Sequence, residues 1–197
     1  MNRLVVLASG EGTNLQAIID ACAQHTIHAS VCAVISDHAA SGALKRAHLG
    51  DIEAVALLPA ASESRPQFDA RLADTVAAFN PDWIVLAGWM RILGMPFLGR
   101  FPNMVVNLHP ALPGEFPGLH AIERAYDEVR AGYRTQSGVM VHLVPDCGID
   151  DGPVLATVTV PATANDTLQD LQHRMHNAEH TLLVSTLADL CRTGAHL

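Results

Sequence analysis

The stretch Leu4-Val5-Val6-Leu7-Ala8-Ser9-Gly10-Glu11-Gly12-Thr13-Asn14-Leu15 decides the fold class of the chain. Residues 4–8 form a short apolar run, which is typical of a buried strand, and a glycine-containing turn at 9–14 closes it. Behind the turn, Leu15, Ile18 and Cys22 recur at helical spacing. A strand, a glycine turn and a helix in this order predict the opening of a β-α-β unit.

Apolar strands and amphipathic helices alternate along most of the chain, which predicts a parallel sheet. Strands are expected at 31–35, 52–58, 83–87 and 104–109, and helices at 39–49, 65–79 and 121–131. Strands 138–144 and 154–160 follow without a helix between them, so they form a hairpin or meander, and Asp166 or Thr167 then caps a long last helix. We expect an α/β fold with one domain over residues 1–197. Its Rossmann-like open sheet is mostly parallel with antiparallel strands toward the C-terminus, and helices cover both faces.

Composition narrows the class of protein. The 197-residue chain carries a formal charge of -8 and is 49% hydrophobic, which indicates a globular protein and disfavours nucleic-acid binding. Four widely spaced cysteines form no CxxC pair and nothing at the N-terminus resembles a signal peptide, so a reducing cytoplasm is expected. No apolar run approaches the roughly 18 residues of a membrane span. A small phosphorylated ligand remains compatible with the acidic balance, because a helix N-terminus holds a phosphate without net positive charge.

The stretch 104–120 is the first candidate for chemistry. An apolar strand brings Asn107 and His109 to positions i and i+2 on one face, while Leu108 points toward a core. Pro110 stops strand pairing, and a Pro- and Gly-rich turn follows. An amide N–H can hold an oxyanion, and an imidazole can move a proton near neutral pH. Taken alone, such a pair is more often structural and satisfies backbone groups at a strand end.

The glycine turn at 10–14 is a candidate anion site, because backbone N–H groups and the Thr13 and Asn14 side chains meet at a helix N-terminus. Dinucleotide binding is an alternative, with Asp37 at the end of the second strand as the ribose-binding acid. However, Leu15 stands where the third glycine of GxGxxG belongs, and the Walker lysine is absent. A single phosphate fits better than a pyrophosphate, and a plain tight turn is equally compatible.

Polar residues in the last third of the chain allow several interpretations. His176, Glu179 and His180 match the H-x-x-E-H pattern of a zinc site. His173 crowds the same face and no convincing third ligand follows, so both histidines of the pattern are interpreted as solvated or capping residues. Glu179 could receive a cationic amine if it faces a cleft. His142, alone among apolar residues, is interpreted as a core histidine with a backbone partner.

Asp150 and Asp151 precede Gly152-Pro153, where two acids are usually turn residues. An acid placed beside His109 would raise the pKa of its imidazole and favour the protonated form. Either aspartate is therefore a natural third member of the Asn107 and His109 pair, and the sequence leaves the choice open.

Together these features resemble the glycinamide ribonucleotide formyltransferase family, folate-dependent enzymes of purine synthesis. The matching segments run in family order over nearly the whole chain, at 4–18, 86–93, 107–112, 116–120 and 149–153. Each segment is modest alone, but in this order, with the Asn-x-His-Pro motif at 107–110, they are highly specific.

The resemblance implies a role for each matching residue. Asn107 would orient and polarise the formyl carbonyl, and His109 would be the general acid or the electrostatic partner of the tetrahedral intermediate. Asp150 would hold this histidine and a proton-relaying water. The formyl group would pass from 10-formyltetrahydrofolate to the amine of 5′-phosphoribosylglycinamide, with no metal. Gly12, Thr13 and Asn14 would bind the acceptor's phosphate, and Glu179 its glycinamide end. The folate would contact Arg65, Trp89, Met90, Arg91, Ile92, Leu93, Asn107 and Val144.

The chain departs from the family at a few positions. Val139 and Met140 replace small hydroxyl residues, Glu115 stands where some members have Lys, and the 144–150 loop is longer than in many members. The expected partners are the two small substrates, without nucleic acid or membrane, for a monomer or a homodimer. Alternative functions are a formyltetrahydrofolate deformylase, a formyltransferase for another amine such as that of methionyl-tRNA, and, in a different class, a non-catalytic nucleotide-binding module.

Overall fold

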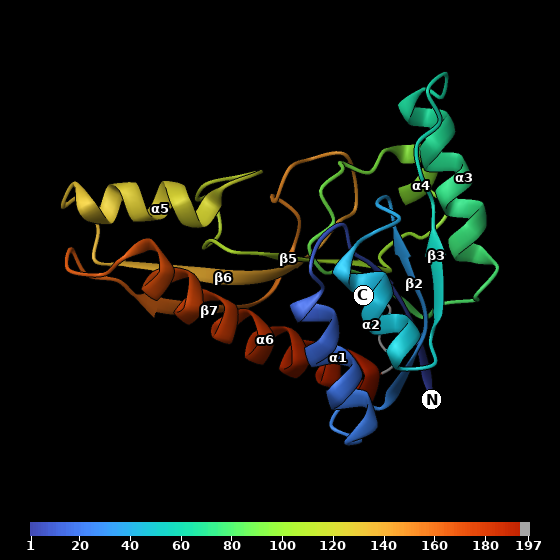
Figure 1. The fold of residues 1–197 in the computed structure, drawn as a ribbon, viewed down its shortest axis with the longest axis horizontal. Coiled ribbons are helices and arrows are strands. Elements are labelled where there is room, and N and C mark those ends of the chain that lie inside the picture. The colour runs from blue at the N-terminus through green and yellow to red at the C-terminus, as the bar shows by residue number, and fades with distance from the viewer. Residues whose placement is uncertain (194–197) are drawn as a thin grey trace.

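The predicted strand, turn and helix at the N-terminus form β1 (Asn2–Leu7) and α1 (Thr13–Ala23) in a computed structural model that describes residues 1–193 (Figure 1). The remaining strands are β2 (Ala29–Ser36), β3 (Glu53–Ala56), β4 (Trp83–Leu86), β5 (Val105–His109), β6 (Gln136–Leu143) and β7 (Val154–Pro161). The remaining helices are α2 (Gly42–Leu49), α3 (Arg65–Ala77), α4 (Met95–Leu98), α5 (Ala121–Arg130) and α6 (Leu168–Thr193).

The strands form one sheet in the order β3-β2-β1-β4-β5-β6-β7. The pairs from β3 to β5 are parallel, whereas β5 pairs with β6, and β6 with β7, in antiparallel fashion. The predicted fold class is therefore confirmed. The helix expected at 39–49 begins only at Gly42, because the Ser41 side chain accepts a hydrogen bond from the Leu44 N–H and caps it there.

Side chains alternate between the two faces of the sheet and divide the core into two layers. On one face, Leu4, Val106 and Leu108 pack with α1, α2, α5 and α6. On the other face, Val5 and Val105 pack with α3 and α4. Asn107 shares the face of Val105, and Leu108 points the other way into a core, as predicted.

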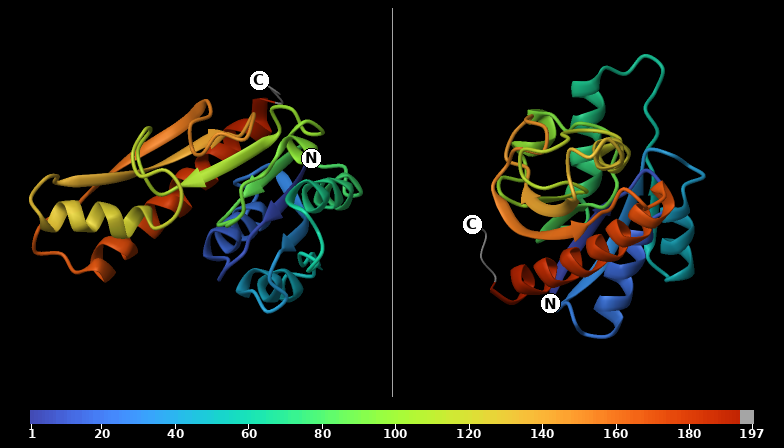
Figure 2. Two further views of the ribbon diagram at one scale, coloured as in Figure 1. Left: turned by 90° about the horizontal axis from the view of Figure 1, so that it is seen from above. Right: turned by 90° about the vertical axis from the view of Figure 1, so that its left-hand side faces the viewer.

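The antiparallel strands β6 and β7 extend away from the parallel part of the sheet as an arm, with α5 and the first half of α6 along it (Figures 1 and 2). Helix α6 runs from the far end of this arm back to α1 and crosses much of the molecule. Because α6 packs against both β6 and α1, it ties the arm to the parallel half of the sheet.

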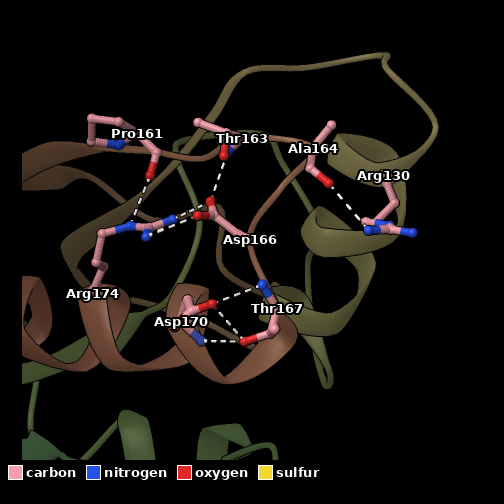
Figure 3. Close-up of polar contacts among 8 residues, drawn as sticks. All are labelled: Arg130, Pro161, Thr163, Ala164, Asp166, Thr167, Asp170 and Arg174. Atoms are coloured by element: carbon pink, nitrogen blue, oxygen red, sulfur yellow. Dashed lines mark hydrogen bonds and ion pairs between the residues drawn. The ribbon is translucent and has the colours of Figure 1, made fainter.

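Helix α6 begins with a reciprocal cap at the far end of the arm (Figure 3). The Asp170 N–H donates to Thr167 Oγ1 over 3.2 Å, and the Thr167 N–H donates to Asp170 Oδ2 over 2.9 Å. Thr167 is thus the capping residue of the two proposed from the sequence. Asp166 instead pairs with Arg174 and accepts the Thr163 N–H.

All four cysteines are free thiols: Cys22, Cys32, Cys147 and Cys191. Burial raises the pKa of the Cys22 and Cys191 thiols to about 11. Within residues 1–193, no helix combines the length and apolar character needed to cross a membrane.

Candidate active site

A cleft of about 650 Å³ lies at the carboxyl ends of the parallel strands. Its walls include the turn after β1, the loop after β4 and the end of β5, which is where open α/β sheets generally bind ligands. All the residues proposed from the sequence line it except Arg65: Gly12, Thr13, Asn14, Trp89, Met90, Arg91, Ile92, Leu93, Asn107, His109, Val144, Asp150 and Glu179.

Asp150 is the acid that meets the strand end, and Asp151 is exposed outside this cluster. Asp150 Oδ1 accepts a hydrogen bond from Asn107 Nδ2 over 3.0 Å, and Asp150 Oδ2 lies 3.3 Å from His109 Nδ1. The Gly118 N–H donates to the same Oδ2 over 2.8 Å. The structure therefore brings Asn107, His109 and Asp150 together, and the choice left open by the sequence falls on Asp150.

His142 is a fourth member of this cluster, and the sequence did not identify it as one. Its Nε2 atom lies 3.1 Å from Asn107 Nδ2 and 3.5 Å from Asp150 Oδ1. Its Nδ1 atom lies 2.8 Å from the Leu143 carbonyl, so Nδ1 carries the proton of the neutral ring and Nε2 accepts from the Asn107 amide. Only 2% of His142 is exposed and its backbone partner is present, so the interpretation as a core histidine is confirmed, and the contacts with Asn107 and Asp150 add to it. Only the pairing of Asn107 with His142 across β5 and β6 could have revealed this role.

Asp150 is held as a carboxylate by its neighbours. Burial alone would raise its pKa, but contacts with His142, the Gly118 N–H and His109 hold the pKa of Asp150 below its usual range. Its backbone adopts φ of 54°, a left-handed conformation that folds the loop back over β5 and β6. The carboxylate is thus ionised at neutral pH and acts as a fixed hydrogen-bond acceptor.

His109 differs from the expectation based on its acidic neighbour. Only 3% of the residue is exposed, and this burial lowers the pKa of His109 despite the opposing charge of Asp150. The predicted rise in pKa was therefore wrong, because desolvation outweighs the ion pair. The neutral ring directs Nδ1 toward Asp150, and Nε2 is buried without a hydrogen bond of normal geometry to the described residues.

The turn before α1 forms the other end of the cleft. Gly12 has φ of 74°, and a Cβ atom there would lie 2.7 Å from Ala43 Cα, so only glycine fits. Unlike α2, helix α1 has no side chain capping its N-terminus. Its first-turn N–H groups are therefore available to an anion in the cleft.

Glu179 of α6 meets this turn from the opposite side. Its Oε2 atom accepts a hydrogen bond from Asn14 Nδ2 over 2.9 Å, and only 5% of the residue is exposed. Burial raises the pKa of Glu179, although the contact with Asn14 and the nearby His176 oppose the shift. A buried carboxylate with one neutral partner is a strong acceptor for a polar ligand group.

The remaining histidines of α6 do not form a metal centre. No group of three or more metal-binding side chains occurs within the described part of the chain. His176 is exposed at the edge of the cleft, as the solvated interpretation predicts. For His180 that interpretation was wrong, because its ring is partly buried, and burial lowers the pKa of His180.

The loop after β4 gives the cleft an apolar wall. Met90 and Ile92 line it with 59% and 45% of their surfaces exposed. The exposed side chains of Leu119 and Ile149 line the same cleft, so apolar surface gathers there. The Arg91 guanidinium lies 4.6 Å from the centre of the Phe68 ring. Arg65 stands outside the cleft, at the start of α3, with its Nε atom 3.8 Å from Asp69 Oδ2.

Comparisons with known proteins agree with this geometry. Residues 2–187 match the family described as formyl transferase. A phosphoribosylglycinamide formyltransferase of Dictyostelium discoideum is 38% identical, over 93% of this chain and 95% of its own length. One from Escherichia coli K12 is 38% identical, over 94% of this chain and 87% of its own. Among solved structures, a glycinamide ribonucleotide transformylase of Symbiobacterium toebii superimposes with a TM-score of 0.92 at 39% identity, covering 98% of this chain and 89% of that one.

Proposed function

Because the chain belongs to the formyl transferase family, we propose that it transfers the formyl group of 10-formyltetrahydrofolate to the amine of 5′-phosphoribosylglycinamide, a reaction of purine synthesis. One observation carries the proposal. Asn107, His109 and Asp150 stand within hydrogen-bonding reach of one another in the same cleft as the uncapped N-terminus of α1. A transfer site and a phosphate site thus share one cavity.

The acceptor amine attacks the formyl carbon, a C–N bond forms, and the carbonyl oxygen becomes an oxyanion. The Asn107 amide is the N–H donor for this oxygen. His109 is neutral at rest, and the oxyanion beside it raises the pKa of the ring, so the charged form stabilises the intermediate. The ionised Asp150 accepts a hydrogen bond from the amine or from a bridging water as the amine loses its proton, and this proton passes to His109. His109 then delivers the proton to the folate nitrogen as the oxyanion collapses to a carbonyl, the C–N bond to the folate breaks and the deformylated folate leaves.

To donate a hydrogen bond to the formyl oxygen, Asn107 must give up one of its present hydrogen bonds. Its two amide hydrogens are engaged by Asp150 Oδ1 and His142 Nε2. Rotation of the amide away from either acceptor frees one hydrogen for the formyl oxygen. His142 and Asp150 therefore orient the amide of Asn107.

The two ends of the cleft suit the two substrates. Gly12, Thr13 and Asn14 offer N–H groups to the acceptor's phosphate, and Glu179 offers a carboxylate to its glycinamide portion. Trp89, Met90, Ile92, Leu93 and Val144 offer apolar surface to the folate ring, and Arg91 offers a charge to its anionic tail. Arg65 lies beyond this wall, where only an extended tail would meet it.

A single catalytic domain over residues 1–197, acting as a monomer or a homodimer, is part of this proposal; the one family match over residues 2–187 and the one continuous sheet support the single domain. We place the reaction in the cytoplasm, in keeping with four free thiols.

The test is formyl transfer from 10-formyl-5,8-dideazafolate to glycinamide ribonucleotide, followed by release of the deformylated product. We expect turnover that requires the amine, and loss of turnover in the Asn107→Ala variant. Formate release at the same rate without the amine would replace this proposal with a deformylase. No turnover with either acceptor would overturn it.

A further inference from the structure

Helix α3 carries a buried carboxylate directly behind the apolar wall of the cleft. Only 2% of Asp69 is exposed, and its Oδ2 atom accepts a hydrogen bond from the Gly94 N–H over 2.9 Å. Gly94 ends the loop that follows β4 and is the residue before α4. Asp69 thus ties the end of the loop that lines the cleft to a helix outside it.

The contact depends on glycine at position 94. A Cβ atom there would lie 2.7 Å from Asp69 Oδ2, closer than such atoms approach in real structures. Since the φ of Gly94 is -102°, backbone strain does not explain the glycine. The close approach of the Asp69 carboxylate explains why glycine occupies position 94.

One guanidinium group pairs with the same carboxylate, and a second stacks on the neighbouring residue. The Nε atom of Arg65 lies 3.8 Å from Asp69 Oδ2, and half of the Arg65 side chain is exposed. The Arg91 guanidinium lies 4.6 Å from the centre of the ring of Phe68, the residue before Asp69. Burial raises the pKa of Asp69, whereas the Gly94 N–H and the charges of Arg65 and Arg91 lower it. Asp69 therefore links the end of the loop that lines the cleft to Arg65, and Arg91 is held on the adjacent ring.

We propose that Asp69 is a positioning residue for the formyl donor: its carboxylate fixes the 88–94 loop, which carries Arg91, through Gly94, and it orients Arg65 toward the anionic tail of the folate. This inference rests on the proposed function, because it assumes that the 88–93 wall receives the donor. Asp69 itself touches neither substrate. A neutral apolar side chain in its place would leave the Gly94 N–H buried without an acceptor and the Arg65 guanidinium without its anion.

The two parts of this role can be separated by substitution. Asp69→Asn keeps an oxygen for the Gly94 N–H and removes the negative charge. Asp69→Ala removes both. Gly94→Ala leaves the carboxylate in the chain and forces it away from the loop. Asp74→Ala is the matched control, since Asp74 lies on the same helix, is 74% exposed and pairs with Arg100 away from the cleft.

Titration calorimetry measures binding of two probes, 10-formyl-5,8-dideazafolate and the same ring system lacking the glutamate tail, and steady-state kinetics measures the KM of each substrate. We expect Asp69→Ala and Gly94→Ala to weaken binding of both probes by about 10- to 100-fold, the worth of a hydrogen bond to a charged group. Asp69→Asn weakens only the probe with the tail. In all three variants the acceptor KM stays within about twofold of wild type, and Asp74→Ala changes neither affinity.

If Asp69 had a purely structural role, the measurements would give different results. Equal losses of donor and acceptor affinity, or a fall in melting temperature with donor affinity unchanged, would overturn the proposal. If Asp69→Ala does not fold, Asp69→Asn and Gly94→Ala still decide it. Absence of binding of either probe by the wild-type protein would instead overturn the proposed function, and this inference with it.

Discussion

The polar side chains at the start of α6 and those in the cleft differ in how they are paired. Around the start of α6, Asp166, Thr167, Asp170 and Arg174 all bond to one another or to nearby backbone (Figure 3). In the cleft, α1 begins without a side-chain cap. There, Asn14 Oδ1 and His109 Nε2 are buried without a hydrogen bond of normal geometry to the described residues.

This difference indicates what each group of residues contributes. Leaving a buried polar atom unpaired costs about 1–3 kcal/mol. The four residues at the start of α6 are paired with one another or with nearby backbone, and so stabilise the end of the helix. In the cleft, the unpaired Asn14 Oδ1 atom and the buried Glu179 carboxylate lower stability, and they are groups that we propose for substrate binding. Substitutions in the two regions should therefore affect different properties.

Asn107→Ala should have the largest effect on activity. Loss of the oxyanion donor should lower kcat by about 10²–10³, with little change in either KM, because the interaction strengthens only in the transition state. Steady-state kinetics measures the loss, and far-ultraviolet circular dichroism verifies the fold. A kcat within a few-fold of wild type in the folded variant would remove Asn107 from the chemistry.

Glu179→Gln should have the second-largest effect. It should weaken binding of the acceptor and stabilise the fold. Loss of the charge should raise the acceptor KM by about 10- to 100-fold, the range for a hydrogen bond to a charged group. The donor KM should not change. The neutral side chain still accepts from Asn14, so the variant should unfold at a higher temperature than wild type near pH 7. Glu53→Gln, on the exposed surface of β3, is the control and should change neither property.

The pH dependence of stability is an independent measure of the burial of the Glu179 carboxylate. The pKa of Glu179 is raised in the folded protein, so folding favours its protonated form. Its contribution to stability is therefore fully present below the unfolded pKa of about 4.5 and is lost as the pH rises through the folded value. Urea denaturation from pH 4 upward should show this loss in wild type and lack it in Glu179→Gln. The same slope in both proteins would mean that Glu179 is not buried as a charge.

Gly12→Ala should have an intermediate effect on acceptor binding and on stability. A left-handed alanine costs about 1–2 kcal/mol, and its Cβ would also press on Ala43. Displacement of the turn should raise the acceptor KM several-fold and lower the melting temperature. Gly132→Ala is the control, since Gly132 is also left-handed, with φ of 78°, and lies outside the cleft with no neighbouring atom within 4 Å of a built Cβ. It should lower the melting temperature and leave the acceptor KM unchanged. Equal effects of the two substitutions on the acceptor KM would mean that acceptor binding does not depend on the turn at Gly12.

The sequence predicted the parallel half of the sheet because its signals are local. Leu4 to Asn14 already contain the strand, the turn and the helix start, and the alternation of strands and helices sets the topology. The role of His142 depends on the antiparallel register of β5 and β6, which pairs residues distant in sequence. The choice of Asp150 depends on a left-handed backbone in a long loop, and the lowered pKa of His109 depends on its burial. None of these three can be read from neighbouring residues.

Thr167→Ala should have the smallest effect and should complete the contrast between the two regions. Loss of this cap should cost about 1 kcal/mol of unfolding free energy. In a chain of this size, that corresponds to a fall of about 2–4 °C in melting temperature. Because the cap lies at the far end of the arm, kcat and both KM values should match wild type. Thr181→Ala, on an exposed turn of the same helix, should cost less, since its hydroxyl only bonds back to the Asn177 carbonyl. A change in acceptor KM in Thr167→Ala would show that the start of α6 influences Glu179 through the helix, and the arm could then no longer be treated as independent of the cleft.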